Sequence, residues 1–113
     1  MHSNLDHTLA ALSDPTRRAV VDLLRKRPLR SSDIAHRLSM SRPAMSRHLR
    51  VLRKTGLVEE GALEDDARVR MYRLNRRPFS ELRHWLDQVE AFWSDQLDAF
   101  KAHAEQKHGK RRT

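Results

Sequence analysis

Two short helical segments separated by three residues constrain the fold more than any other feature of this sequence. Ser31 or Ser32 can accept hydrogen bonds from the free amide groups that open the first segment, at residues 33–38. After a break at residues 39–41, Ser41 can cap a second helix that carries a proline in its first turn. Two capped helices joined by so short a turn are typical of a helix-turn-helix.

The second of these helices has an apolar side and a polar side. Met45, Leu49 and Leu52 recur at spacings of four and three, so we expect this face to lie in the core. The opposite face carries arginine and serine side chains, which can hydrogen-bond to guanine edges and to phosphates. We therefore expect six residues to contact duplex DNA: Ser41, Arg42, Pro43, Ser46, Arg47 and Arg50.

Basic residues are concentrated around these helices. From Arg17 to Lys54 there are twelve of them against two acidic residues, whereas the whole chain has 23 Lys and Arg against 15 Asp and Glu. A solvated surface would also be charged, but the rest of the chain is slightly acidic. A basic block beside a near-neutral remainder favours a polyphosphate partner.

The flanking segments predict a mainly α-helical fold with one small β-hairpin. Helices are expected at residues 3–12 and 15–27, and Asp14 can cap the second of them. Between Leu57 and Leu74 the residues favour two extended strands around a polar centre. Helix-turn-helix followed by hairpin is the order of a winged helix-turn-helix.

A long helix completes the chain. It is expected from Phe79 to about Lys107, and residues 108–113 form a basic tail that we expect to be disordered. With 113 residues the chain has room for one modest core, so we expect a single DNA-binding and dimerisation domain over residues 1–107.

The expected wing is unusually acidic. Five acids fall within eight residues, namely Glu59, Glu60, Glu64, Asp65 and Asp66. A phosphate backbone would repel them, although Arg68 and Arg70 lie just beyond and can reach DNA. Alternatively, the acids pair with those arginines or with the rest of the domain. We include Arg68 and Arg70 among the expected DNA contacts and leave contact by the wing tip open.

Apolar stripes on the first and last helices predict a homodimer. A stripe this wide and aromatic would be an exposed patch on a monomer, so burial against a second subunit is the simplest explanation. The expected interface residues are Leu5, Leu9, Leu12, Leu82, Trp85, Leu86, Val89, Phe92, Trp93, Leu97 and Phe100.

Several motifs together resemble the ArsR-type family of bacterial winged-helix repressors. They are Ala11–Arg18, Ser41–Leu52, Gly56–Val58 and Tyr72–Leu74, and the resemblance spans nearly the whole chain. It implies a homodimer that binds an inverted repeat near a promoter, often its own, and blocks transcription. The stretch from Phe79 to Trp93 resembles a metal-free branch of the family.

Three other functions compete with a sequence-specific repressor. A winged-helix adaptor would use the aromatic helix to bind protein, and an architectural protein would coat DNA without a preferred site. A metal-responsive repressor would need ligands such as His84, Asp87, His103, Glu105 and His108, but their spacing does not place them on one face. We therefore expect no metal and no other cofactor, and the sequence identifies no effector.

Other function classes lack their usual motifs. The chain contains no cysteine, so disulfides and thiolate metal sites are excluded. It has no glycine-rich phosphate loop and no catalytic triad spacing, so we expect no enzymatic activity. No apolar run is long enough to span a membrane and no signal peptide is recognisable, so we expect a cytoplasmic protein.

Overall fold

The computed structural model describes residues 3–63 and 65–111, with side chains described from residue 4 to residue 106 apart from residue 64. The elements are α1 (Ser3–Leu12), α2 (Pro15–Leu24), α3 (Ser31–Arg37), α4 (Arg42–Lys54), β1 (Val58–Leu63), β2 (Asp66–Leu74) and α5 (Arg76–Arg111). They form two compact units, Met1–Glu81 and Leu82–Thr113, which we call the N-terminal and C-terminal units.

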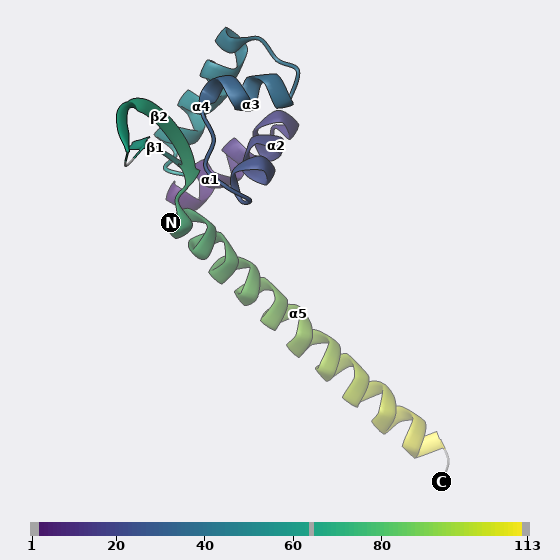
Figure 1. The fold of residues 1–113 in the computed structure, drawn as a ribbon. Coiled ribbons are helices and arrows are strands. Elements are labelled where there is room, and N and C mark those ends of the chain that lie inside the picture. The colour runs from purple at the N-terminus through teal and green to yellow at the C-terminus, as the bar shows by residue number, and fades with distance from the viewer. Residues whose placement is uncertain (1–2, 64, 112–113) are drawn as a thin grey trace. The chain divides into compact units, whose positions relative to one another are not determined.

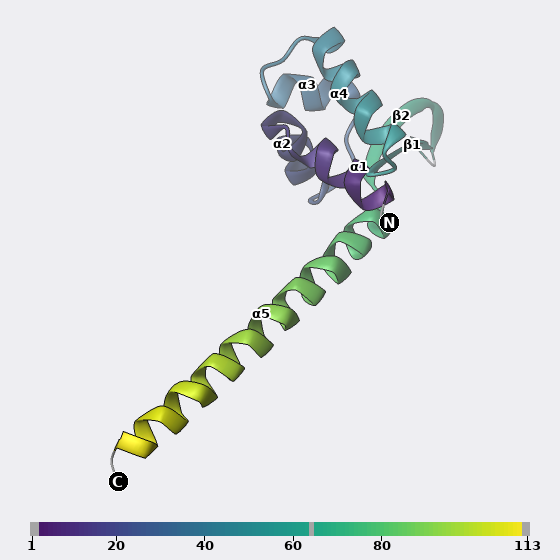
Figure 2. The same ribbon diagram turned by 180° about the vertical axis from the view of Figure 1, so that it is seen from behind.

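The N-terminal unit is a winged helix-turn-helix, which confirms the expected fold class. α3 packs against α4, the hairpin packs against the end of α4, and α1 packs against α2 (Figures 1 and 2). The core is formed by buried apolar side chains of α2, α3, α4 and β1, among them Val20, Ile34, Leu49 and Val58. Because all these elements share one core, the orientation of α4 is set by the packing of the whole unit.

Strands β1 and β2 form an antiparallel hairpin whose register runs from Val58 opposite Leu74 to Ala62 opposite Arg70, with an irregularity before Leu63. An isolated β-bridge beside the hairpin was not expected from the sequence. Leu29 pairs with Tyr72 through two backbone hydrogen bonds, of 3.1 and 2.8 Å. The segment between α2 and α3 is therefore tied to the wing.

This pairing explains why the predicted cap of α3 is wrong. Backbone pairing at Leu29 keeps the chain extended up to Arg30, so α3 begins at once at Ser31. Arg30 occupies the capping position, and no side chain there accepts a hydrogen bond. Ser31 and Ser32 already lie inside the helix, where neither can act as its cap. α2 ends at Leu24, three residues before the expected end at Arg27.

α4 ends in the way that Gly56 predicts. Gly56 has a φ of +80°, a conformation that is open to glycine and costly for other residues. Its N–H donates to the Arg53 carbonyl at 3.0 Å, and the Leu57 N–H donates to the Leu52 carbonyl at 2.9 Å. This Schellman motif satisfies the last carbonyls of the helix and turns the chain into β1.

α5 begins at Arg76, three residues before the expected start, because Asn75 acts as its cap. The Asn75 side-chain oxygen accepts a hydrogen bond from the Arg77 N–H at 3.3 Å. Its amide nitrogen donates to the Gly56 carbonyl at 3.0 Å, which joins the start of α5 to the end of α4. Pro78 fits within the first turn, where its missing N–H is not needed.

The C-terminal unit consists of the remainder of α5. The helix continues to Arg111, beyond the expected end at Lys107 and through most of the expected tail. The expectation of a single domain over residues 1–107 stays a prediction. Within the described part of the chain, no helix combines the length and the apolar character needed to cross a bilayer.

Candidate nucleic-acid interface

Helix α4 is held in the N-terminal unit by a cap and by an apolar face. The Ser41 hydroxyl accepts a hydrogen bond from the Ala44 N–H at 3.3 Å, as the sequence predicts. Met45, Leu49 and Leu52 are each at most 1% exposed, so all three hold this face of the helix in the core. Rotation of the helix about its axis would expose them, at a cost of roughly 1.5–3 kcal/mol per side chain.

The side of α4 away from this buried face lies open to solvent. The residues predicted to contact DNA from this helix are all exposed: Ser41, Arg42, Pro43, Ser46, Arg47 and Arg50. Among the described residues, no carboxylate lies within ion-pair distance of Arg42, Arg47 or Arg50. The helix therefore presents three arginines and two serines whose hydrogen-bonding groups are available to another molecule.

Two arginines of the basic block serve the fold instead. The Arg17 guanidinium donates to the Ala11 carbonyl at 2.7 Å, and Arg18 donates to the Leu12 carbonyl at 2.8 Å. Both carbonyls belong to the last turn of α1, where a helix lacks internal donors and attracts positive charge. These arginines join α1 to α2. The number of basic side chains that are available to DNA is therefore smaller than the count for the whole block.

Asp14 caps α2 through its carboxylate. Its carboxylate accepts hydrogen bonds from the Arg17 N–H at 3.0 Å and the Thr16 N–H at 2.8 Å. The bond from Arg17 is the largest influence that lowers the pKa of Asp14 below its ordinary value of 3.8. Desolvation opposes this shift, whereas the bond from the Thr16 N–H and the nearby Arg17 guanidinium lower the pKa further.

The acidic residues of the wing form ion pairs with nearby arginines. Glu60 accepts from Arg53 of α4 at 2.9 Å and from Arg70 of β2 at 3.2 Å. Glu59 pairs with Arg73 at 3.5 Å. The Glu60 carboxylate thus fastens the wing to the end of α4, and it neutralises part of the charge of Arg70.

Arg68 differs from Arg70 in its exposure. Its side chain is 94% exposed and lies 3.5 Å from the Asp66 carboxylate. Arg68 is therefore much more accessible to another molecule than Arg70, which pairs with Glu60. Of the remaining acids, Asp65 is exposed, and Glu64 lies outside the described residues.

Sequence reasoning missed Arg53 and Glu60 as a pair. The two residues are seven apart, and an ion pair between the end of a helix and a following strand has no sequence signature. The only available signal was the unusual number of acids in the wing beside an arginine-rich strand, and it does not specify which partners meet.

The expected dimer residues differ in how far they are exposed within one chain. Leu5 is only 8% exposed within its own chain, whereas Leu9 is 40% exposed. Leu12, Leu82, Trp85 and Val89 are half-buried. The most exposed are Leu86, Phe92, Trp93, Leu97 and Phe100. Five large apolar side chains thus lie open to solvent along one helix, which is uncommon on a protein surface.

The histidines and carboxylates weighed as metal ligands do not gather. Within the described residues, no three histidine or carboxylate side chains lie close enough to hold one metal ion. Asp87 instead pairs with Arg83 at 2.9 Å. The side chain of His108 lies outside the described part.

Comparison with known families matches this region to one family model. Residues 14–60 match the model described as "Bacterial regulatory protein, arsR family". That segment runs from the cap of α2 to the start of the wing, so it contains the exposed face of α4.

Two transcriptional regulators are similar to this chain, one of them over most of its length. The chain is 37% identical over 95 residues to the HTH-type transcriptional regulator Rv2034 of Mycobacterium tuberculosis, covering 84% of this chain and 83% of that protein. It is 34% identical over 56 residues to the transcriptional repressor SdpR of Bacillus subtilis, covering 50% of this chain and 62% of that protein.

A solved structure shows the same fold. An ArsR-like transcriptional regulator from Rhodococcus sp. RHA1 superposes with a TM-score of 0.74 at 32% sequence identity. The match covers 88% of this chain and 92% of that chain.

Proposed function

The chain belongs to the arsR family of bacterial regulatory proteins, and from this premise we propose that it is a homodimeric repressor of transcription. It binds an inverted repeat in a promoter, and its own promoter is the first candidate. The family is one of DNA-binding transcriptional regulators, and the relative SdpR is named a repressor. A repressor of bacterial promoters works in the cytoplasm.

One observation carries the proposal. Arg42, Arg47 and Arg50 lie exposed on α4 with no carboxylate partner among the described residues, while the opposite face of the helix is buried. Arginine can donate two hydrogen bonds to the edge of guanine in the major groove. Ser41 and the start of the helix supply donors for phosphate, which position the protein on the duplex.

The proposed mechanism is steric. Two copies of α4, related by a two-fold axis, would enter successive major grooves about 34 Å apart, one at each half of the repeat. Bound there, the dimer would exclude RNA polymerase from the promoter. The apolar stripe of α5, with Leu9 and Leu12 of α1, is the proposed subunit interface.

The proposal is tested by measuring the affinity of the purified protein for its own promoter. Fluorescence anisotropy at one fixed salt concentration compares a labelled promoter fragment with a scrambled fragment of the same length. We expect Arg47→Ala to weaken promoter binding roughly tenfold or more, because one bidentate base contact is worth about 1–3 kcal/mol. Binding to the scrambled fragment should change much less.

Arg77→Ala is the matched control, since it removes one exposed arginine that lies at the start of α5. It should leave the promoter affinity within about twofold of the wild type. Weak binding that does not distinguish the promoter from the scrambled fragment would contradict a specific repressor and favour the protein-binding adaptor. Normal promoter binding by Arg47→Ala would refute the role of that residue.

A further inference from the structure

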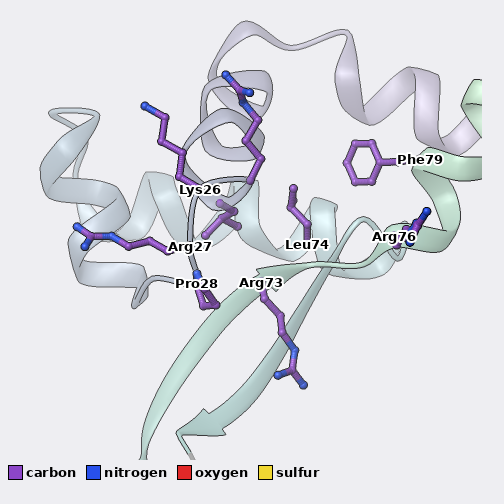
Figure 3. A pocket seen from close by; sticks show the side chains of 9 residues that line it. Lys26, Arg27, Pro28, Arg73, Leu74, Arg76 and Phe79 are labelled. Carbon is purple, nitrogen blue, oxygen red and sulfur yellow. The ribbon is translucent and has the colours of Figure 1, made fainter.

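An open pocket of about 480 Å³ lies in the N-terminal unit, lined by the end of α2, the turn after it, the end of β2 and the start of α5 (Figure 3). Its volume falls in the range of small-molecule sites, about 300–1,000 Å³. None of its lining residues is among those expected to contact DNA or a second subunit, so neither role accounts for it.

The lining combines an apolar floor with a basic rim. The apolar residues are Leu24, Pro28, Leu74 and Phe79. The basic residues are Arg25, Lys26, Arg27, Arg73 and Arg76, all of them exposed. In the view of Figure 3, Leu74 lies between Lys26 and Arg27 on one side and Arg76 on the other.

The basic rim is only partly neutralised. Arg25 pairs with Asp22 at 3.6 Å, and Arg73 pairs with Glu59 at 3.5 Å. In the part of the chain that the structure describes, Lys26, Arg27 and Arg76 have no carboxylate within ion-pair distance. An anion bound among them would therefore gain attraction without displacing an existing pair.

The start of α5 adds to this positive potential. The first turn of a helix favours negative charge, yet that of α5 contains no acidic residue and begins with Arg76 and Arg77. An anionic ligand in the pocket would supply the charge that this helix end lacks.

We propose that this pocket binds a small amphipathic anion, a molecule with an apolar body and a single carboxylate or similar acid group. The body packs on Leu74 and Phe79, and the acid group is attracted by Lys26 and Arg27 on one side of this apolar floor and by Arg76 on the other. These exposed side chains are long and flexible, so they can turn toward the ligand without a change in the backbone. A duplex phosphate backbone fits less well because it offers no apolar part to cover the floor.

The test measures ligand binding to the full chain without DNA, so its outcome is independent of the proposed repressor function. Octanoate serves as the probe. Acetate and octanol are the comparison ligands, because acetate lacks the apolar body and octanol lacks the charge. Amide shifts in a two-dimensional NMR titration report both the site and the affinity. We expect octanoate to shift the amide signals of residues 24–27, 73–77 and 79, and to bind roughly tenfold or more tightly than acetate or octanol.

Two single variants test the rim. Arg76→Glu and Lys26→Glu should each weaken octanoate binding about fivefold or more, because each puts a like charge beside the carboxylate. Lys101→Glu, an exposed residue of α5 outside the pocket, makes the same change in net charge and should leave binding unaltered.

Three results would overturn the proposal. Octanoate could shift only residues 86–100, where the exposed apolar side chains of α5 lie. Acetate or octanol could bind as tightly as octanoate. Lys101→Glu could weaken binding as much as Arg76→Glu does, which would show attraction by the overall charge alone.

Discussion

At the scale of single residues, Glu60 links the wing to the end of α4. Its side chain is only 19% exposed, and its two oxygens meet Arg53 at 2.9 Å and Arg70 at 3.2 Å. The carboxylate therefore connects α4 to both strands of the wing. Its neighbour Glu59 forms a looser pair with Arg73, in which both side chains are about half exposed.

We expect this difference in burial to appear in stability. A double-mutant cycle with Glu60→Gln and Arg53→Gln should give a coupling of about 0.5–1 kcal/mol in the free energy of unfolding, measured by urea denaturation. The matched cycle with Glu59→Gln and Arg73→Gln should give a coupling close to zero, because water screens the more exposed pair. Equal couplings in the two cycles would contradict the assignment of Glu60 as the link.

At the scale of elements, the start of α2 and both ends of α4 are defined by how their terminal backbone groups are satisfied. Ser41 caps α4 at its start, and Gly56 closes it in a Schellman motif. α2 is capped at its start by Asp14, whose carboxylate accepts hydrogen bonds from two backbone N–H groups. Since these bonds favour the charged carboxylate, the cap depends on pH.

The sign of that dependence follows from the lowered pKa of Asp14. A carboxyl group whose pKa is lower in the folded state adds stability above its unfolded pKa and loses it as the pH falls through the folded value. We expect Asp14→Asn to melt roughly 2–5 °C below the wild type near neutral pH. The difference should shrink once the pH falls below 3.8, as Asp14 is protonated in the wild type.

Melting curves recorded from about pH 7 to about pH 2.5 check this expectation. Asp22→Asn is the control on the same helix, because Asp22 is 72% exposed and only pairs with Arg25. It should show no comparable difference at any pH. A difference for Asp14→Asn that grows on acidification would contradict the role of the charged cap.

At the scale of the whole molecule, the exposed apolar stripe of α5 is the main reason to expect a second subunit. Trp93 is 60% exposed and Phe100 is 73% exposed. Phe92 and Trp93 stack edge to face with ring centroids 6.0 Å apart. Aromatic side chains of this kind dominate the binding energy of subunit interfaces.

We expect Trp93→Ala to weaken the proposed homodimer roughly tenfold or more. Sedimentation at a series of dilutions measures the effect as a shift of the dissociation midpoint. Asp98→Ala is the control, because helical spacing places residue 98 well away from the side that carries Trp93. An unchanged sedimentation mass with unchanged thermal stability would count against this interface.

Much of the candidate interface could be predicted because it depends on local rules. The spacing of Met45, Leu49 and Leu52 predicts which side of α4 is buried, and hence that Arg42 and Arg47 are exposed. The bounds of α1 were also predicted correctly. Apolar periodicity and helix caps act within a few residues, so they can be recognised without knowledge of the tertiary fold.

What the sequence determined by itself is the set of helices, the hairpin after them and the polar side of α4, since each depends on residues close together in the chain. Tertiary structure decided which charges are available. It assigned Arg17 and Arg18 to the last turn of α1 and Glu60 to Arg53 and Arg70, and it set the start of α3 through the pairing of Leu29 with Tyr72. The physical reason is that an ion pair or a strand pair depends on distance in space, which sequence separation does not encode.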